Sequence, residues 1–254
     1  MKLDKNIIRQ RFGKALTTYD HQSVVQDRVA ERLLGLLAKG GCTTPRRVLE
    51  IGCCTGLLTR RIIQRYPEIG ELWCNDLVKE AEKPLREKMG SFAGKLNFIG
   101  GDVEEATLPG ALDLVISSST FHWIADLESF FEKMSRIIRP GGYLAFAMYG
   151  PDNLHEIREV SGVGLVYPDP ATLFRVSSDH FQLISYQSRR ECLHFSDVRG
   201  LLNHLRQTGV NALDKTVWTP GKLNSFMNEY HYRFKEVKGV RVTYHPIYFI
   251  LRRP

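Results

Sequence analysis

The chain has 254 residues, of which 43% are hydrophobic and 25% are charged. This composition is ordinary for a globular protein and excludes disordered and fibrous classes, while the length fits one large α/β domain or one domain with an insertion. No apolar run approaches the roughly 18 residues of a membrane span, and the N-terminal residues lack the apolar block of a signal peptide. We therefore expect a cytoplasmic protein.

Lysine and arginine together number 35 against 28 aspartates and glutamates, so the net charge is +7. The basic residues are scattered, and no polybasic run marks an arm that binds nucleic acid. A solvated basic surface accounts for this charge. The alternative is that the basic surface binds an acidic partner. The five cysteines are odd in number and lack the spacing of zinc ligands, so we predict neither a disulfide framework nor a metal site.

The first 40 residues are expected to be helical, because apolar residues recur at helical spacing over 7–15 and again over 24–37. Gly40 and Gly41 should end the second helix. From residue 46 short apolar strands alternate with helices, which predicts βαβ units and a parallel sheet. The predicted strands are 47–51, 71–75, 96–99, 112–117 and 143–148, and the predicted helices among them are 57–65, 79–89 and 127–138.

After residue 149 the alternation breaks. The pattern there predicts helices at 153–160, 198–207 and 223–234, and strands at 189–195 and 240–251. Pro246 inside the last strand argues for a bulge or an edge position. We expect the helices of this region to form a cap over the carboxyl edge of the sheet.

A turn with the sequence EIGCCTG, residues 50–56, follows the first strand of the alternating region. Ligands of doubly wound sheets bind beside this turn, where glycine lets the backbone approach them closely. A dinucleotide fingerprint would need glycine at 52, 54 and 57, but Cys54 and Leu57 occupy two of these positions. Gly56 instead fits the spacing E-x-G-x-G-x-G, with Cys54 at the middle glycine.

This spacing resembles the first motif of class I S-adenosylmethionine-dependent methyltransferases. Asp76 at the end of the second strand, Asp102 and Val103 after the third, and R-P-G-G at 139–142 before the fifth follow in the family's order. The resemblance implies that Asp76 binds the ribose hydroxyls, that Asp102 accepts a hydrogen bond from the adenine amino group, and that Val103 flanks the ring. Taken singly, these acidic residues could equally be helix caps or turn residues.

The resemblance implies S-adenosyl-L-methionine as methyl donor and S-adenosylhomocysteine as product. The small Cys54 side chain departs from the family's glycine, so we expect weakened rather than abolished binding. The residues that the resemblance assigns to the cofactor lie in these motifs and in the N-terminal helices. They are Tyr19, Glu50, Gly52, Cys53, Cys54, Gly56, Asp76, Leu77, Asp102, Val103, Ser117 and Ser118.

The flanking segments resemble a narrower family, the malonyl-[acyl-carrier protein] O-methyltransferases of biotin synthesis. Residues 11–15, Tyr19-Asp20 and Gln26 are similar to the opening of that family, and Ser117 with F-H-W at 121–123 is similar to the end of its fourth strand. There the family usually has Asn and Gln, where this chain has Ser118 and His122. Further matching segments extend the likeness over nearly the whole chain. These segments are 149–158, 205–211, 223–230 and 243–244.

The implied reaction is methyl transfer to the free carboxylate of a malonyl thioester on acyl carrier protein. A carboxylate is ionised near pH 7, so the reaction needs alignment and exclusion of water rather than a general base. Aromatic faces tolerate the sulfonium charge, and Tyr19, Phe121 and Trp123 are candidates for this role, although the last two are equally plausible core residues. The candidates for positioning the substrate, none of them a certain catalytic residue, are Tyr19, His122, Trp123, His155, Arg158 and Arg206.

Arg206 is the preferred clamp for the malonyl carboxylate, because its segment L-R-x-x-G matches the family's L-K-x-x-G with arginine for lysine. A planar guanidinium suits a carboxylate, and Tyr19 could close the other side. His155 and Arg158 are the next candidates for the clamp. The alternatives to these functional roles are that Arg206 is a solvated surface residue and that His122 is a purely structural histidine.

The implied fold is α/β, with a doubly wound, mostly parallel, seven-stranded Rossmann-like sheet. It divides into an N-terminal helical lid at 1–45, a cofactor-binding core at 46–150, and cap helices with terminal strands of the same sheet at 151–254, all in one domain. We expect a monomer or weak dimer that binds neither nucleic acid nor a membrane.

Three other functions fit the residues less well. A methyltransferase for a small molecule would need no cationic clamp. An RNA methyltransferase is disfavoured by the missing basic patch and by the missing N-P-P-Y/F-type tetrad after the fourth strand. A non-catalytic scaffold that binds the cofactor is suggested only by Cys54 and Ser118.

Overall fold

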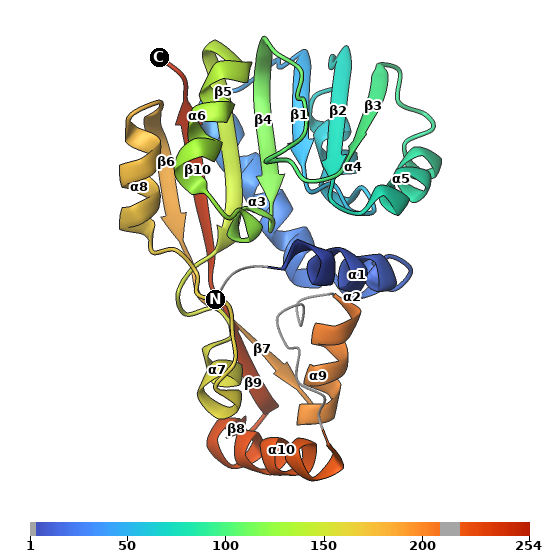
Figure 1. The fold of residues 1–254 in the computed structure, drawn as a ribbon, viewed down its shortest axis with the longest axis vertical. Coiled ribbons are helices and arrows are strands. Elements are labelled where there is room, and N and C mark those ends of the chain that lie inside the picture. Colours follow the sequence, from blue (N-terminus) through green and yellow to red (C-terminus); the bar gives the residue numbers. More distant parts are fainter. Residues whose placement is uncertain (1–3, 209–218) are drawn as a thin grey trace.

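The computed structural model describes residues 4–208 and 219–254 and confirms the doubly wound sheet (Figure 1). Its strands are β1 (Arg47–Ile51), β2 (Glu71–Asp76), β3 (Lys95–Gly100), β4 (Leu112–Ser118), β5 (Ile138–Tyr149), β6 (Gln182–Ser188) and β10 (Pro246–Arg252). They lie in the order β3-β2-β1-β4-β5-β10-β6. Strands β1 to β5 pair in parallel, whereas β10 is antiparallel to both of its neighbours.

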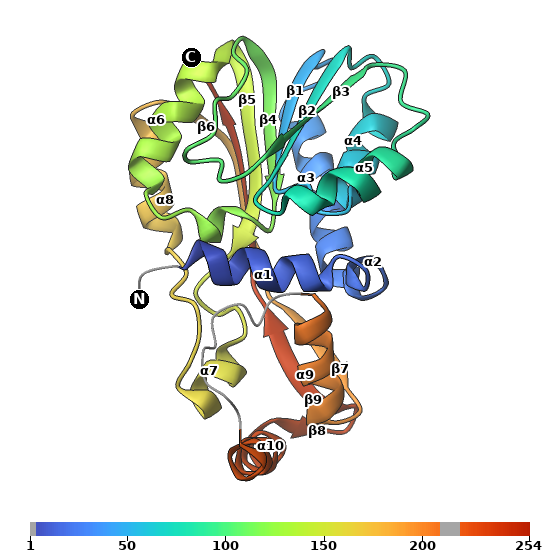
Figure 2. The same ribbon diagram turned by 45° about the vertical axis from the view of Figure 1, so that its right-hand side comes forward.

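Helices cover both faces of this sheet (Figures 1 and 2). One face packs against α3 (Val24–Lys39), α4 (Leu57–Arg65) and α5 (Glu82–Lys88), and the other against α6 (Leu127–Ile137) and α8 (Pro170–Ser178). Successive strand residues alternate between the two faces. In β1, for example, Val48 belongs to the first apolar cluster and Leu49 to the second, and both are fully buried.

The N-terminal residues form two short helices before α3, namely α1 (Lys5–Ala15) and α2 (Tyr19–Gln22). Asp4 begins α1 as its cap, since its carboxylate accepts hydrogen bonds from the backbone N–H groups of Asn6 and Ile7. Figure 2 shows α1 lying across the end of the sheet where the parallel strands point. The helical N-terminal segment thus covers the carboxyl ends of the strands, the usual ligand-binding edge.

Two segments inside the α/β region form 3-10 turns. The predicted helix at 79–89 is a 3-10 turn, η1 (Lys79–Ala81), followed by α5. Pro84 is tolerated because it lies in the first turn of α5, where no intrahelical N–H donor is needed. A second 3-10 turn, η2 (Phe121–Trp123), follows β4 and carries the F-H-W segment.

The C-terminal region contains a second, smaller sheet that the sequence did not predict. Its strands are β7 (Glu191–Phe195), β8 (Lys235–Glu236) and β9 (Gly239–Tyr244), in the antiparallel order β7-β9-β8. The helices around it are α7 (His155–Ser161), α9 (Val198–Gln207) and α10 (Pro220–Phe234). The cap is therefore built of helices and an antiparallel sheet below the main sheet (Figure 1), and not of helices alone.

The prediction of a single strand at 240–251 was wrong. It is two strands, because β9 belongs to the small sheet and β10 to the large one, and the chain changes sheets at His245. Pro246 lies neither at an edge nor at the bulge of β10, which is between Ile250 and Leu251. It is the first residue of an interior strand, a position that tolerates a missing N–H group.

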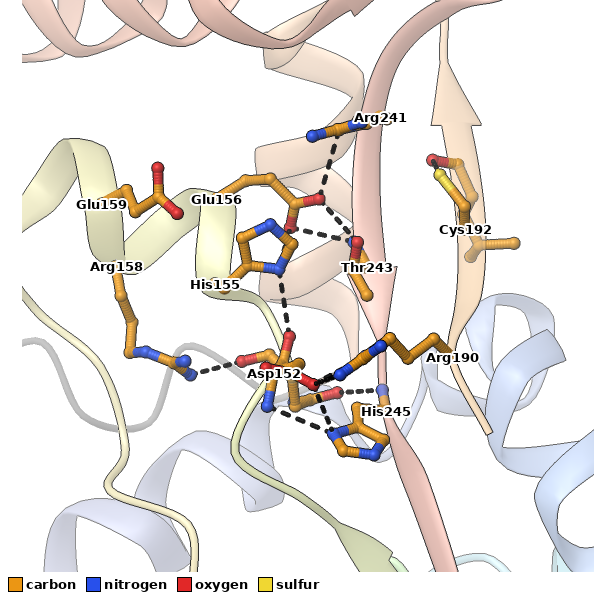
Figure 3. A network of polar contacts seen from close by, with 12 residues as sticks. Asp152, His155, Glu156, Arg158, Glu159, Arg190, Cys192, Arg241, Thr243 and His245 are labelled. Carbon is orange, nitrogen blue, oxygen red and sulfur yellow. Dashed lines mark hydrogen bonds and ion pairs between the residues drawn. The ribbon is translucent and has the colours of Figure 1, made fainter. Parts of the chain in front are cut away.

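A network of polar contacts surrounds this change of sheet (Figure 3). Glu156 of α7 is fully buried and accepts hydrogen bonds from the backbone N–H of Thr243, at 3.0 Å, and from its hydroxyl, at 2.6 Å. Asn153 accepts from the backbone N–H of His245 at 3.1 Å, and Asp152 forms an ion pair with Arg190 at 2.6 Å. These contacts fix the segment after β5 against the chain where it passes from β9 to β10.

Within residues 4–208 and 219–254, no helix combines the length and the apolar character that a membrane span requires.

Candidate active site

The loop between β1 and α4 needs left-handed backbone at three positions. Gly52 and Gly56 have φ values of +76° and +89°, and a Cβ atom at Gly52 would lie 2.0 Å from the hydroxyl of Thr120. Only glycine fits there. Cys54 also has a positive φ, +46°, which strains an L-amino acid. The loop thus keeps the shape of a glycine loop, with a strained cysteine at its centre.

Asp76, at the end of β2, holds this loop in place. One carboxylate oxygen accepts a hydrogen bond from the backbone N–H of Cys54 at 2.7 Å, and the other accepts from that of Val78 at 2.8 Å. Burial raises the pKa of Asp76 to about 6, against the opposing effect of these two hydrogen bonds. The carboxylate faces the cavity beneath α1, so it both shapes the loop and forms part of the wall.

Three adjoining cavities follow the carboxyl ends of the strands beneath α1. We name them the Asp102 cavity, the Asp76 cavity and the His122 cavity after one residue of each, and Trp123 lines all three. The first two also share Ile8, Gly52, Leu77 and Thr120. The last two also share Phe12, Tyr19 and Ser119. The three cavities therefore lie next to one another along the edge of the sheet.

The Asp102 cavity is an apolar slot with a carboxylate in its wall. Ile8, Val103 and Ile124 line it and are almost fully buried. The Asp102 carboxylate pairs with the ammonium group of Lys5 from α1 at 2.5 Å. A slot of this kind suits a flat ring that carries an amino donor, and Lys5 closes the cavity from the lid.

The His122 cavity is lined by aromatic and neutral polar side chains: Phe12, Tyr19, Gln26, Ser119, His122, Trp123, Tyr149, Tyr167 and Thr208. His122 is only 8% exposed, and burial lowers its pKa to about 3, so the ring is neutral. Its Nδ1 atom has no hydrogen-bond partner among the described residues, nor do the Nε1 atom of Trp123 and the amide oxygen of Gln26. The cavity therefore offers unused polar atoms.

Eight of the predicted cofactor residues line the first two cavities. They are Tyr19, Gly52, Cys54, Asp76, Leu77, Asp102, Val103 and Ser118. Tyr19 reaches the cavities from the start of α2, and burial keeps it a neutral phenol by raising its pKa. The arrangement brings residues from five separate elements and loops to one edge.

The other four predicted cofactor residues lie outside these cavities. Glu50 is 1% exposed, with the Cys74 thiol 4.0 Å from its carboxylate, and burial raises its pKa to about 8. The Ser117 hydroxyl donates to the carbonyl of Ile51 at 2.8 Å. Cys53 is buried against Cys74, and Gly56 caps α4 and lines a separate groove. These residues support the loop from behind.

Of the predicted substrate-positioning residues, Tyr19, His122 and Trp123 meet at the His122 cavity, and the other three do not. Arg206 is exposed on α9, where its guanidinium donates to the Asn203 side chain at 3.2 Å. The apolar stripe of α9, which includes Leu201 and Leu205, packs inward and leaves position 206 outside. Arg206 therefore lies outside the described lining of the His122 cavity. Gly209 to Asn211 of its motif lie outside the described residues.

His155 and Arg158, the alternative clamps, belong to the cap. The Nδ1 atom of His155 lies 3.2 Å from the carbonyl oxygen of Asp152, and the Arg158 guanidinium donates to the carbonyls of Pro151 and Asn153. Figure 3 shows both on α7 beside the change of sheet. Neither of them lines the His122 cavity.

Several cavity residues escaped prediction because no local pattern marks them. Ser119 and Thr120 lie in the turn after β4, where Ser119 has a φ of +60°. Tyr167 comes from a segment without regular structure, and Tyr149 is the last residue of β5. Lys5 lies 97 positions from its partner Asp102. The only available signal was the position of Tyr149 at the end of a predicted strand.

The chain is similar to known proteins at two levels. The family described as "Methyltransferase domain" matches residues 49–146. Among solved structures, a protein from Bacillus halodurans C-125 is 16% identical with a TM-score of 0.63, covering 89% of this chain and 98% of that one. N-methyltransferase NodS from Bradyrhizobium japonicum WM9 is 13% identical with a TM-score of 0.55, covering 89% of this chain and 94% of NodS. These likenesses establish the fold.

Relatives of higher identity extend over almost the full chain. A malonyl-[acyl-carrier protein] O-methyltransferase from Chlorobium phaeovibrioides is 38% identical over 253 residues, which are 98% of this chain and 97% of the relative. A protein of the same name from Bacteroides thetaiotaomicron is 35% identical over 266 residues, covering 99% of both. Identity of this level over the lid, core and cap together shows that the chain belongs to the malonyl-[acyl-carrier protein] O-methyltransferase family.

Proposed function

We propose that this chain transfers a methyl group from S-adenosylmethionine to the free carboxylate of a malonyl thioester on acyl carrier protein. The products are a malonyl-carrier-protein methyl ester and S-adenosylhomocysteine, and the step belongs early in biotin synthesis. The observation that carries the proposal is the 38% identity over nearly the full length with a relative of that name. The match includes the N-terminal helices and the C-terminal cap as well as the α/β core.

The cavities fit the cofactor on their own geometry. The Asp102 carboxylate and the apolar walls around it suit an adenine ring, and Asp76 lies in the next cavity, where it can accept from ribose hydroxyls. Gly52 leaves no side chain between the loop and the ligand. The bound cofactor supplies an electrophilic methyl group on a positively charged sulfur.

The His122 cavity adjoins the Asp76 cavity and is the expected place for the acceptor. A malonyl carboxylate is ionised near pH 7 and needs no base. The chain contributes alignment of the two reacting groups and exclusion of water beneath α1. The aromatic walls formed by Phe12, Tyr19 and Trp123 tolerate a neighbouring positive charge.

A single incubation tests the proposed function. The protein, labelled cofactor and malonyl-carrier protein are combined, and the carrier is examined by mass spectrometry. We expect a mass gain of one methyl group on the malonyl-carrier protein. Acetyl-carrier protein, which lacks the free carboxylate, is the matched control. Equal methylation of both carriers, or of neither, would contradict the proposal.

We also propose a cytoplasmic monomer or weak dimer. An acyl carrier protein is itself a macromolecule, so the entrance to the His122 cavity must stay open to it. Light scattering after size-exclusion chromatography tests the assembly, and cell fractionation tests the location.

A further inference from the structure

The acceptor cavity contains unused polar atoms but no charged side chain among its described lining residues. The Nδ1 atom of His122 and the Nε1 atom of Trp123 are buried and have no hydrogen-bond partner within residues 4–208 and 219–254. The His122 ring is fixed between the rings of Trp123, Tyr149 and Tyr167, with centroid distances of 4.9, 5.4 and 5.8 Å. A fixed, buried ring nitrogen without a partner is a feature that a bound ligand explains.

The neighbouring cations are used elsewhere. The Arg158 guanidinium lies 5.9 Å from the ring centroid of Tyr167 and does not itself line the cavity. Its two terminal nitrogens donate to the carbonyls of Pro151 and Asn153. Arg206 is exposed on α9. Among the residues that the structure describes, the carboxylate of an acceptor in this cavity therefore meets neutral donors rather than an arginine or a lysine.

Neutral surroundings favour the reaction itself. An oxygen of the carboxylate forms a bond to the methyl carbon while the bond from that carbon to sulfur breaks, and the electron pair of the broken bond stays on sulfur. One negative and one positive charge become a neutral ester and a neutral thioether, and no proton moves. Charge is therefore partly lost in the transition state, so a cationic side chain would stabilise the reactants more than the transition state and slow the step.

We propose that neutral donors of the His122 cavity, His122 among them, hold the acceptor carboxylate, and that the sulfonium of the cofactor compensates its charge. This inference rests on the proposed function and names how its acceptor is recognised. In a cavity of low polarity the two opposite charges attract strongly. They can meet where the Asp76 and His122 cavities adjoin, between Phe12, Tyr19, Ser119 and Trp123.

The first experiment removes the positive charge from the cofactor site. Malonyl-pantetheine is titrated into the protein saturated with sinefungin, whose amine is charged where the sulfonium methyl would be, and into the protein saturated with neutral S-adenosylhomocysteine. We expect binding at least tenfold tighter with sinefungin. Equal affinities would overturn the inference, because the protein itself would then supply the compensating charge.

The second experiment tests the donor. His122→Phe keeps an aromatic ring and removes the hydrogen bond, so kcat/KM for malonyl-pantetheine should fall at least tenfold while the affinity for S-adenosylhomocysteine is unchanged. His122→Gln restores a neutral donor and should restore most of the activity. The unchanged cofactor affinity shows that the variant is folded. Activity of His122→Phe at the wild-type level would overturn the assignment.

Arg206→Met is the matched control for a cationic clamp. Because Arg206 is exposed, this variant should turn over malonyl-pantetheine at the wild-type rate. Loss of turnover in Arg206→Met would contradict the proposal that neutral donors hold the carboxylate. It would support the hypothesis that Arg206 binds it. Failure of the wild-type protein to methylate any malonyl thioester is a different result, because it would overturn the proposed function together with this inference.

Discussion

Cys54 is the residue at which this chain departs most clearly from its family's loop. Its backbone has a left-handed φ of +46°, which glycine adopts most readily, and Cys54 lines the Asp76 cavity. A left-handed L-residue costs about 1–2 kcal/mol, although glycine costs about 0.5–1 kcal/mol more conformational entropy on folding. The two effects nearly cancel in stability, so the main consequence of Cys54 concerns the space left for the ligand.

Cys54→Gly should therefore bind S-adenosylhomocysteine severalfold more tightly, with little change in melting temperature. Isothermal titration calorimetry and thermal unfolding measure the two quantities. Cys54→Ala is the control, because it removes only the sulfur and keeps the strained backbone, and it should gain less affinity. Weaker binding by Cys54→Gly would show that the thiol contacts the ligand favourably.

Glu50 makes stability depend on pH. Burial raises its pKa from an ordinary 4.5 to about 8, so between these values the folded protein keeps a proton that the unfolded chain has lost. The stabilisation from this group is complete at low pH and is lost as the pH rises towards 8 and beyond. Asp76, with a pKa raised to about 6, acts in the same direction over a lower range.

Glu50→Gln removes the titration and keeps the shape of the side chain. We expect the melting temperature of the cofactor-free variant to exceed that of the wild type by roughly 3–10 °C at pH 8, with a smaller difference at pH 6. Thermal unfolding from pH 5 to 9 measures this, and the comparison isolates Glu50 because Asp76 is present in both proteins. A constant difference across this range would show that Glu50 is ionised throughout.

Asp113→Asn serves as a control of opposite sign. Although burial alone would raise the pKa of Asp113, hydrogen bonds from Arg139 and from the backbone of Arg46 and Arg47 hold it below the usual range. Its stabilisation is present at neutral pH and lost as the pH falls through that lowered pKa. This variant should therefore melt below the wild type at pH 7, with a difference that shrinks in acid.

Helix α1 acts as a lid that ion pairs fasten to the core. Burial lowers the pKa of Lys5, but hydrogen bonds to Asp102 and Glu104 outweigh it and raise the pKa overall, so the ammonium stays charged. Glu104 also accepts hydrogen bonds from the backbone of Ala125 and Asp126 after η2. The lid, the Asp102 cavity and the turn after β4 are thereby joined through one lysine.

Lys5→Met keeps the side-chain stem and removes both ion pairs. Partly exposed pairs contribute about 0.2–1 kcal/mol, so we expect the cofactor to dissociate about two- to fivefold faster from a loosened lid. Stopped-flow displacement of S-adenosylhomocysteine measures the rate, with Arg9→Met, exposed on the same helix, as control. Slower dissociation from Lys5→Met would mean that Lys5 competes with adenine for Asp102.

The protein as a whole carries a net charge of +7, and acyl carrier proteins are acidic. Opposite net charges steer encounter, and salt screens that attraction. We expect kcat/KM for malonyl-carrier protein to fall roughly tenfold from low to moderately high ionic strength. Malonyl-pantetheine, which lacks the protein partner, is the control and should respond much less. A salt-independent rate with the carrier protein would argue against electrostatic docking.

Much of the α/β core could be predicted from the sequence, because the type of each element there depends on the residues within that element. The strand at 47–51 and the helix at 57–65 coincide with β1 and α4, since short apolar runs separated by amphipathic segments specify their own type. The glycine loop and Asp76 could be placed for the same reason, as they follow strands whose carboxyl ends must meet at one edge. Residues 170–178 and 182–188 have weaker patterns, so α8 and β6 were missed.

The amino-acid sequence thus determined the class of fold and the family. Only the tertiary structure showed that the last apolar run is divided between two sheets. A buried apolar strand has the same sequence pattern whichever sheet it joins. It also decided which residues line the His122 cavity, whose walls include parts of α1, η2, β5 and the end of α9. Arg206 shows the physical reason: a motif specifies a residue, but the face on which its helix packs decides what the side chain reaches.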